Sequence, residues 1–213
     1  MRHLPHSRHG FRAAQRYRGQ TSLVGGAYTD RMQAAAPGKP VWMVLQGFGW
    51  GEILPERPEE ERKELRQPTA KESRFMAYDA IVHGARGILY WGTAYLDRTT
   101  SFWDDLLALV SELKGLQPVL AAPDSSLDIS CTIEETFGSV DVGIRTLAKN
   151  VDGKTWLIVV NEWTSPLKGA LAGLGGLEGK VFLDTTSGKP SVIKDGQLRI
   201  ALTDYEVRVL AEQ

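Results

Sequence analysis

Two short apolar runs, residues 41–45 and 87–91, dominate the hydrophobic pattern of the first half of the chain. The polar Gln46 follows the first run, the second ends at Trp91, and turn residues flank the first. Runs that are this short and apolar throughout are typical of strands buried on both faces, as in a parallel sheet covered by helices. We therefore predict two buried parallel strands whose carboxyl ends carry functional side chains.

Helical patterns surround these two runs. Thr69 and Glu72 have the spacing of a capping box and predict a helix that ends near His83. A further helix is expected at residues 27–36, before the first strand. The order strand, helix, strand is a βαβ unit, and such units are almost always right-handed and parallel.

The next helix is predicted after the second strand. Ser101 and Asp104 repeat the capping signature, and Gly115 ends the helical pattern. Its apolar spacing predicts one buried stripe, formed by Leu106, Leu107, Val110 and Leu113.

The second half of the chain has a different pattern. Residues 116–126 are rich in proline, alanine and serine, which indicates a domain boundary. Residues 142–148 alternate between apolar and polar side chains, and residues 155–161 are mainly apolar. An Asp-Gly turn lies between the two ranges, which predicts a β-hairpin. Further strands are expected at 179–183, 191–193, 198–202 and 206–210. We predict that residues 121–213 form a small antiparallel β-sandwich.

The segments PVWMVLQGFGW and ESRFMAYDAIVHGARGILYWG, with the helix after them, resemble the last two βα units of a (β/α)8-barrel glycoside hydrolase. The resemblance is to the retaining glycosidases whose catalytic carboxylates end the fourth and seventh strands. It implies that residues 23–120 are a partial barrel, an incomplete TIM-barrel segment, followed by the β-domain that closes many such barrels. The fold class expected is α/β plus all-β.

The resemblance also implies a sugar site, and one position departs from it. The family's nucleophile would be a glutamate at the end of the seventh strand, where this chain has Gln46. An amide can bind a hydroxyl but cannot attack an anomeric carbon. Glu52, in the glycine-flanked loop beyond, is therefore the candidate catalytic residue, with solvation in a surface loop as its alternative. Candidate substrate-binding residues are Gln46, Phe48, Trp50, Trp91, Tyr95 and Asp97; the alternative is a core strand with ordinary packing aromatics.

Residues 1–22 stand apart because they contain five arginines and three histidines but no acidic residue. We predict a disordered or spurious basic segment there, without an apolar signal region. The whole chain has 213 residues and a formal net charge of -1, which gives no reason to expect nucleic acid as a partner. A single cysteine excludes an internal disulfide, and no apolar run is long enough to span a membrane. No cofactor or metal is predicted, and the localisation is unknown.

Two βα units cannot close an eight-stranded barrel, so an apolar edge should remain exposed. We therefore expect a fragment of a carbohydrate-active, glycoside hydrolase-like protein that is inactive alone, with carbohydrate as its partner. Self-association through the exposed barrel edge is a further expectation. The alternative is a non-catalytic carbohydrate-binding or interaction module, with Trp156 or Trp163 of the sandwich as platforms.

Overall fold

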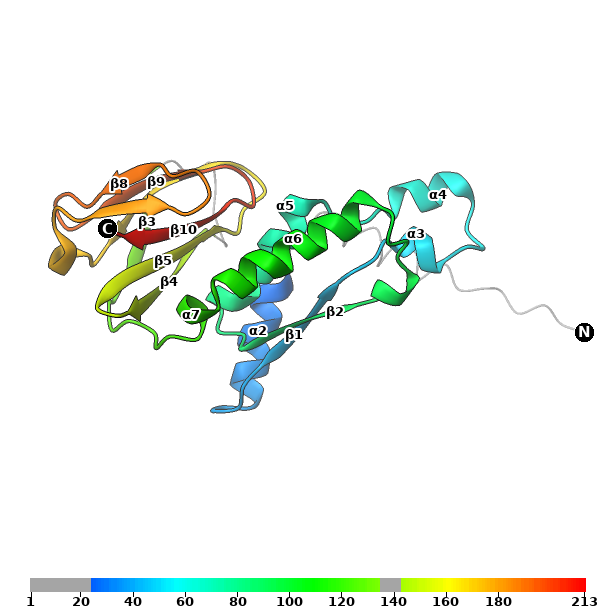
Figure 1. Cartoon of the computed structure of the whole chain (residues 1–213), viewed down its shortest axis with the longest axis horizontal. Helices are drawn as coiled ribbons and strands as arrows, with labels where there is room; N and C mark the ends of the chain where they lie inside the picture. Colours follow the sequence, from blue (N-terminus) through cyan, green and yellow to red (C-terminus); the bar gives the residue numbers. More distant parts are fainter. Residues whose placement is uncertain (1–23, 135–142) are drawn as a thin grey trace, which may run out of the picture.

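The computed structural model describes residues 24–134 and 143–213 (Figure 1). The predicted basic segment at 1–22 lies outside the described residues. The first half contains α2 (Val24–Ala35), β1 (Trp42–Gln46), α3 (Trp50–Ile53), α4 (Glu59–Glu64), α5 (Ala70–Val82), β2 (Gly87–Trp91), η2 (Thr93–Tyr95), α6 (Ser101–Gly115) and α7 (Gln117–Leu120).

The predicted βαβ unit is confirmed. β1 and β2 pair in parallel, with Trp42 opposite Gly87 at one end and Gln46 opposite Trp91 at the other. Helix α5 forms the connection, and Thr69 caps it by accepting a hydrogen bond from the Glu72 backbone N–H. The side chain of Glu72 reaches back to the Thr69 N–H, which completes the predicted capping box.

The prediction that both strands are buried on two faces is wrong. On one face, Trp42, Val44, Leu89 and Trp91 are each about half exposed. On the other face, Leu45 is buried against α5, and Met43 and Ile88 pack against the same cluster. No element among the described residues covers this face of the two-stranded sheet.

The predicted stripe of α6 is half wrong. Leu106 is buried and Leu113 is partly buried, but Leu107 and Val110 are half exposed. The helix instead turns Phe102, Leu106 and Leu109 inward. Its apolar surface is wider than one contact face, so spacing alone could not select the buried side. The N-cap is Thr100, one residue before the predicted Ser101.

The second half is the predicted pair of antiparallel sheets. One sheet has the order β4-β5-β10-β7-β8 and the other β3-β6-β9. The strands are β3 (Ser130–Ile133), β4 (Ile144–Val151), β5 (Lys154–Asn161), β6 (Leu167–Ala172), β7 (Val181–Asp184), β8 (Pro190–Val192), β9 (Leu198–Leu202) and β10 (Val207–Glu212), with η3 (Gly175–Leu177) between β6 and β7.

The hairpin predicted from the Asp-Gly corner joins β4 and β5. Asp152 and Gly153 both have positive φ, as a two-residue turn of this kind requires. Strands β3 and β6 were not predicted. The sequence Lys168-Gly-Ala breaks the apolar pattern of β6, and β3 is only four residues long.

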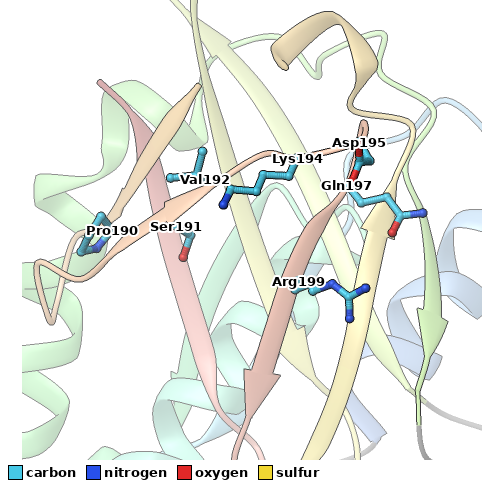
Figure 2. Close-up of a pocket in the computed structure, with 7 residues that line it drawn as sticks. All are labelled: Pro190, Ser191, Val192, Lys194, Asp195, Gln197 and Arg199. Carbon is cyan, nitrogen blue, oxygen red and sulfur yellow. The ribbon is translucent and has the colours of Figure 1, made fainter. Parts of the chain in front are cut away.

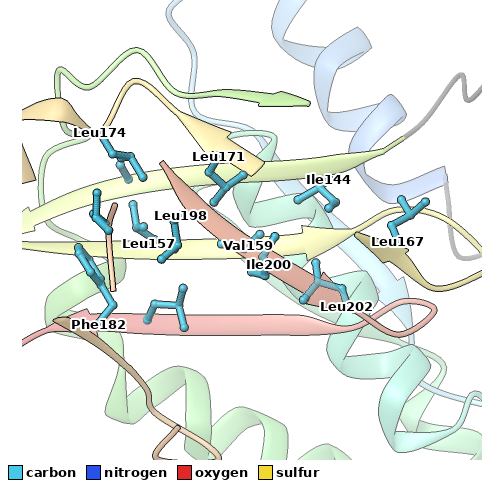
Figure 3. Packing of buried hydrophobic residues seen from close by; sticks show 13 residues of the cluster. Ile144, Leu157, Val159, Leu167, Leu171, Leu174, Phe182, Leu198, Ile200 and Leu202 are labelled. Carbon is cyan, nitrogen blue, oxygen red and sulfur yellow. The ribbon is translucent and has the colours of Figure 1, made fainter. Parts of the chain in front are cut away.

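The core of the sandwich lies between its two sheets (Figure 3). Leu157 and Val159 of β5 face Leu171 of β6 and Leu198 of β9 across this space. The opposite face of β5 and β10 is also buried, because α5 covers it. The side chains of this second face are Ile158, Val160, Val207 and Val209.

Helix α5 therefore joins the two halves. Its residues Phe75, Ala77 and Tyr78 are fully buried between β1 and the sandwich. Arg74 adds polar contacts, because its guanidinium binds Glu112 of α6 at 2.8 Å and the Val207 carbonyl of β10 at 2.8 Å. Figure 1 shows the sandwich at one end of the molecule and α3 and α4 at the other.

Candidate functional site

Five of the predicted site residues come together where β1 and β2 end: Gln46, Phe48, Trp50, Trp91 and Tyr95. Gln46 and Trp91 are register partners, so their side chains leave the same face of the two strands. This is the carboxyl end of the parallel pair. Phe48 lies in the loop after β1, Trp50 begins α3, and Tyr95 ends η2 after β2. Residues far apart in the sequence are thus neighbours here.

Phe48 is the centre of an aromatic cluster. Its ring centroid lies 5.0 Å from that of Trp50 and 5.0 Å from that of Trp91, both edge to face. Tyr95 extends the cluster, with its ring centroid 6.2 Å from that of Trp91. These separations are in the range where aromatic pairs attract beyond simple burial.

The cluster requires a glycine beneath it. Gly92 directly follows β2 with φ of 86°, a left-handed conformation that glycine adopts without strain. A Cβ at Gly92 would overlap the Phe48 ring. The chain can therefore turn out of β2 while Phe48 packs against its backbone.

Exposure divides the cluster into a support and a surface. Phe48 is only 2% exposed, so it holds the other rings and offers no free face of its own. Trp50, Trp91 and Tyr95 are 46%, 51% and 58% exposed. These three can present ring surface to a ligand.

The amide of Gln46 is already engaged. Its Nε2 donates a hydrogen bond to the Phe48 carbonyl at 2.8 Å. This bond holds the loop after β1 in place, and it needs a donor that a carboxylate lacks. The amide oxygen has no hydrogen bond within the described part of the chain.

Glu52 has a capping role in this structure. One of its carboxylate oxygens accepts the N–H of Gly49, the N-cap of α3, at 2.5 Å, which is the half of a capping box that a glycine N-cap allows. The other oxygen accepts from the Gln67 amide at 2.5 Å. Both oxygens therefore have partners, and the catalytic role of Glu52 stays a prediction.

Gln67 is a candidate site residue that the sequence analysis missed. It lines a hollow of charged and polar groups between α3 and α4, next to the aromatic cluster, together with Gly49, Gly51, Glu52, Glu59, Arg62, Lys63, Leu65 and Arg66. Gln67 lies in a loop 15 residues from Glu52, and no motif connects the two. Only the chain path brings them together.

Asp97 lies in the loop between η2 and α6 and is fully exposed. Its Oδ1 accepts hydrogen bonds from the Thr99 N–H at 2.9 Å and the Thr99 hydroxyl at 2.8 Å. These two bonds lower the pKa of Asp97, the backbone bond most. The carboxylate is thus an anion that fixes the loop, and its other oxygen can accept from a ligand.

A second hollow lies on the sandwich, around β8, β9 and the turn between them (Figure 2). Its lining is polar and contains no aromatic ring: Pro190, Ser191, Val192, Lys194, Asp195, Gln197 and Arg199. The side chain of Trp163 packs against the sandwich core instead. The hollow on the sandwich therefore has no aromatic ring on which a sugar could stack.

No helix in residues 24–134 or 143–213 is both long and apolar enough to cross a membrane.

No protein-family model matches the chain, and no curated protein matches it at a significant level.

Solved structures do resemble it. An AmyP variant in complex with maltotriose superposes with a TM-score of 0.53 at 14% identity, over 85% of this chain and 43% of that one. The α-amylase from Geobacillus thermoleovorans, complexed with acarbose, gives 0.53 at 12% identity, over 82% and 39%. The maltogenic α-amylase AmyB from Thermotoga neapolitana gives 0.50 at 10% identity, over 92% and 48%.

The chain spans less than half the length of each of these three enzymes. At such low identity the likeness concerns the fold alone. It extends over both halves of the chain, since more than four-fifths of the residues superpose. The chain therefore has a partial glycoside hydrolase fold, in which a parallel strand pair with its helices is followed by a β-domain. The described residues form no closed barrel.

Proposed function

We propose that the chain carries the C-terminal part of the sugar-binding surface of a glycoside hydrolase-like protein. β1 and β2 correspond to the seventh and eighth strands of a (β/α)8 barrel. Trp91, Trp50 and Tyr95 contact sugar rings, while Gln46 and Asp97 bind hydroxyls. Phe48 supports the rings from below.

The observation that carries this proposal is the alignment of Gln46 with Trp91 at the carboxyl ends of two parallel strands. In barrels of parallel strands, the functional residues lie at this end. Half-exposed rings next to amide and carboxylate groups have the chemistry that a sugar needs, because its ring faces are apolar and its edge is polar.

We further propose that the 213-residue chain alone does not hydrolyse glycosides. Retention needs two carboxyl groups about 5 Å apart across the scissile bond. Gln46 occupies the position of one of them, and both oxygens of Glu52 hold other groups. A polypeptide that supplies the remaining strands would have to contribute the catalytic acid.

Binding of a malto-oligosaccharide such as maltotriose, measured by tryptophan fluorescence, tests the sugar site. The solved structures of similar fold that were complexed with maltotriose and acarbose suggest this ligand class. Trp91→Ala should weaken binding by about 1–3 kcal/mol, roughly 5- to 150-fold. Trp42→Ala is the matched control, since Trp42 has similar exposure on the same face but lies at the amino end of β1. Equal effects of both changes would refute the proposed location.

The second candidate function is a non-catalytic interaction module. The half-exposed apolar side chains Trp42, Val44 and Leu89 favour it, because monomeric proteins seldom expose such a contiguous patch. Under this alternative no sugar binds, and the patch itself binds a protein surface. The fluorescence titration separates the two, since saturable sugar binding is expected only under the first.

A further inference from the structure

A cluster of one histidine and two carboxylates lies at the carboxyl-terminal end of α5. Asp79 and His83 are one helical turn apart, and Glu162 directly follows β5. Their potential ligand atoms all lie within 4.8 Å of one another. The three side chains are 3%, 6% and 12% exposed, so the cluster lies in the interface between α5 and the sandwich.

The imidazole is oriented as a metal ligand would be. Its Nδ1 lies 2.9 Å from a carboxylate oxygen of Asp30 on α2. Its Nε2 points at the two carboxylates, 2.6 Å from Glu162 Oε1 and 3.7 Å from Asp79 Oδ1. Metal-bound histidines commonly donate their other ring N–H to a carboxylate, which fixes the tautomer and the ring. Asp30 occupies that outer position.

Asp79 supplies an independent observation. Its Oδ2 accepts the Gly26 N–H at 2.6 Å. Its Oδ1 accepts no hydrogen bond within the described part of the chain, because the 3.7 Å separation from His83 is too long for one. The Asp79 side chain is only 3% exposed, so water solvates its charge poorly, and a cation beside Oδ1 would stabilise the ionised form.

Gly26 makes room for the cluster. A Cβ at this position would overlap the His83 ring and lie 2.9 Å from Asp79 Oδ1. Any larger residue would therefore displace the imidazole from the two carboxylates. Arg145 contacts the cluster at its rim: its Nη2 lies 3.3 Å from His83 Nδ1 and 3.6 Å from Asp30, and its Nε lies 3.6 Å from Glu162. No ion pair joins Arg145 to Asp79 among the described residues.

We propose that Asp79, His83 and Glu162 bind a divalent transition metal ion, with zinc as the best fit to this ligand set. Zinc bonds of about 2.0–2.1 Å in tetrahedral geometry separate neighbouring ligand atoms by roughly 3.3 Å, between the 2.6 Å and 3.7 Å distances in the cluster. Water would complete the coordination. The ion links α5 to the sandwich, and its site lies away from the sugar surface because α5 runs back toward the amino ends of the strands.

The test uses the whole chain with His3, His6 and His9 each changed to glutamine, so that His83 is the sole histidine. Zn2+ uptake is measured by titration calorimetry, and Co2+ uptake by visible absorption. We expect one ion per chain, with at least tenfold weaker binding after His83→Gln or Glu162→Gln. Glu134→Gln, which changes an exposed carboxylate paired with Arg199, should leave the affinity unchanged.

Absence of uptake, or uptake that survives both His83→Gln and Glu162→Gln, would overturn the proposal. If His83→Gln does not fold by circular dichroism, nitrogen-15 NMR of the single imidazole in the histidine-depleted chain decides. A Zn2+-dependent shift of Nε2 together with a higher Tm supports the site. An imidazole that stays doubly protonated and unshifted with excess Zn2+ at pH 7 means an ion pair only, and refutes it.

Discussion

Gln46 and Trp91 lie side by side at the carboxyl ends of β1 and β2, paired in register although 45 positions separate them in the chain. The Gln46 amide donates to the Phe48 carbonyl, and the Phe48 ring supports Trp91. One hydrogen bond thus connects the end of β1 with the aromatic surface next to β2.

The first prediction follows from that bond. Gln46→Glu places an ionised acceptor against the Phe48 carbonyl, and the donor is lost. We expect the free energy of unfolding at pH 7 to fall by about 1–3 kcal/mol, the cost of a buried acceptor without its partner. The penalty should shrink near pH 4, because a protonated carboxyl group can donate. Urea denaturation of variant and parent at both pH values measures this.

Gln46→Met is the control for that change, because it removes the donor without adding charge. Its penalty should be the same at pH 7 and pH 4. If Gln46→Met is as stable as the parent at both pH values, the hydrogen bond does not control the loop. No recovery of glycoside hydrolysis is expected from Gln46→Glu in this chain.

The second prediction concerns the exposed face of the parallel pair. Trp42, Val44 and Leu89 leave enough apolar surface that the chain should self-associate at micromolar concentration and bind a hydrophobic dye. Leu89→Lys should reduce association several-fold by burying a charge in the contact. Sedimentation velocity over a concentration series measures it.

Leu107→Lys is the matched control, since Leu107 is equally half exposed but lies on α6. It should leave association unchanged. A monodisperse parent chain without dye binding would count against an open sheet face.

The third prediction concerns the connection between the two halves. The side chain of Lys149 on β4 is 2% exposed, and its Nζ binds Asp124 at 2.5 Å and the Ala122 carbonyl at 3.0 Å. Asp124→Asn should lower the free energy of unfolding by about 1–3 kcal/mol, since the buried ammonium loses its anion. Asp128 is exposed like Asp124 and lies in the same connecting segment, but it has no ion pair with Lys149, so Asp128→Asn should change the free energy of unfolding by less than about 0.5 kcal/mol. If both variants lose the same free energy of unfolding in urea denaturation, the ion pair between Lys149 and Asp124 does not stabilise the fold.

The fourth prediction is a pH dependence at the start of α5. Hydrogen bonds from Arg66 and then from Thr69 lower the pKa of Glu72 to about 2, although burial acts in the opposite direction. Since the folded pKa lies below the ordinary value of 4.5, Glu72 stabilises the fold above pH 4.5. That contribution is lost as the pH falls from about 4.5 to about 2.

Thermal unfolding between pH 7 and pH 2 measures this contribution. Glu72→Gln should lower Tm at neutral pH, and the difference from the parent should vanish near pH 2. Glu60→Gln on the exposed helix α4 should follow the parent throughout. A constant difference between Glu72→Gln and the parent would contradict the assignment.

The fifth prediction concerns the sandwich alone. Residues 121–213 contain a complete core between two sheets, so the isolated segment should unfold cooperatively. It should be less stable than in the chain, because Ile158, Val160, Val207 and Val209 lose their cover from α5. Calorimetry without a cooperative transition would refute the independent fold.

The sequence alone determined most of the elements. Capping residues Thr69 and Glu72 fix the start of α5, and apolar runs locate β1 and β2, because these signals act between near neighbours. The Asp-Gly turn located the first hairpin of the sandwich for the same reason. The aromatic site could also be anticipated, since parallel strands place their carboxyl ends together.

Tertiary structure alone decided what each side chain does. One carboxylate oxygen of Glu52 accepts a hydrogen bond from Gln67, which lies 15 residues away in the chain. The cluster around His83 includes Glu162, 79 residues further along the chain. The faces of β1 and α6 were predicted wrongly, because an apolar residue looks the same whether its covering element is present or not. Periodicity reports which positions can be buried, but only the arrangement of the other elements determines which of them are.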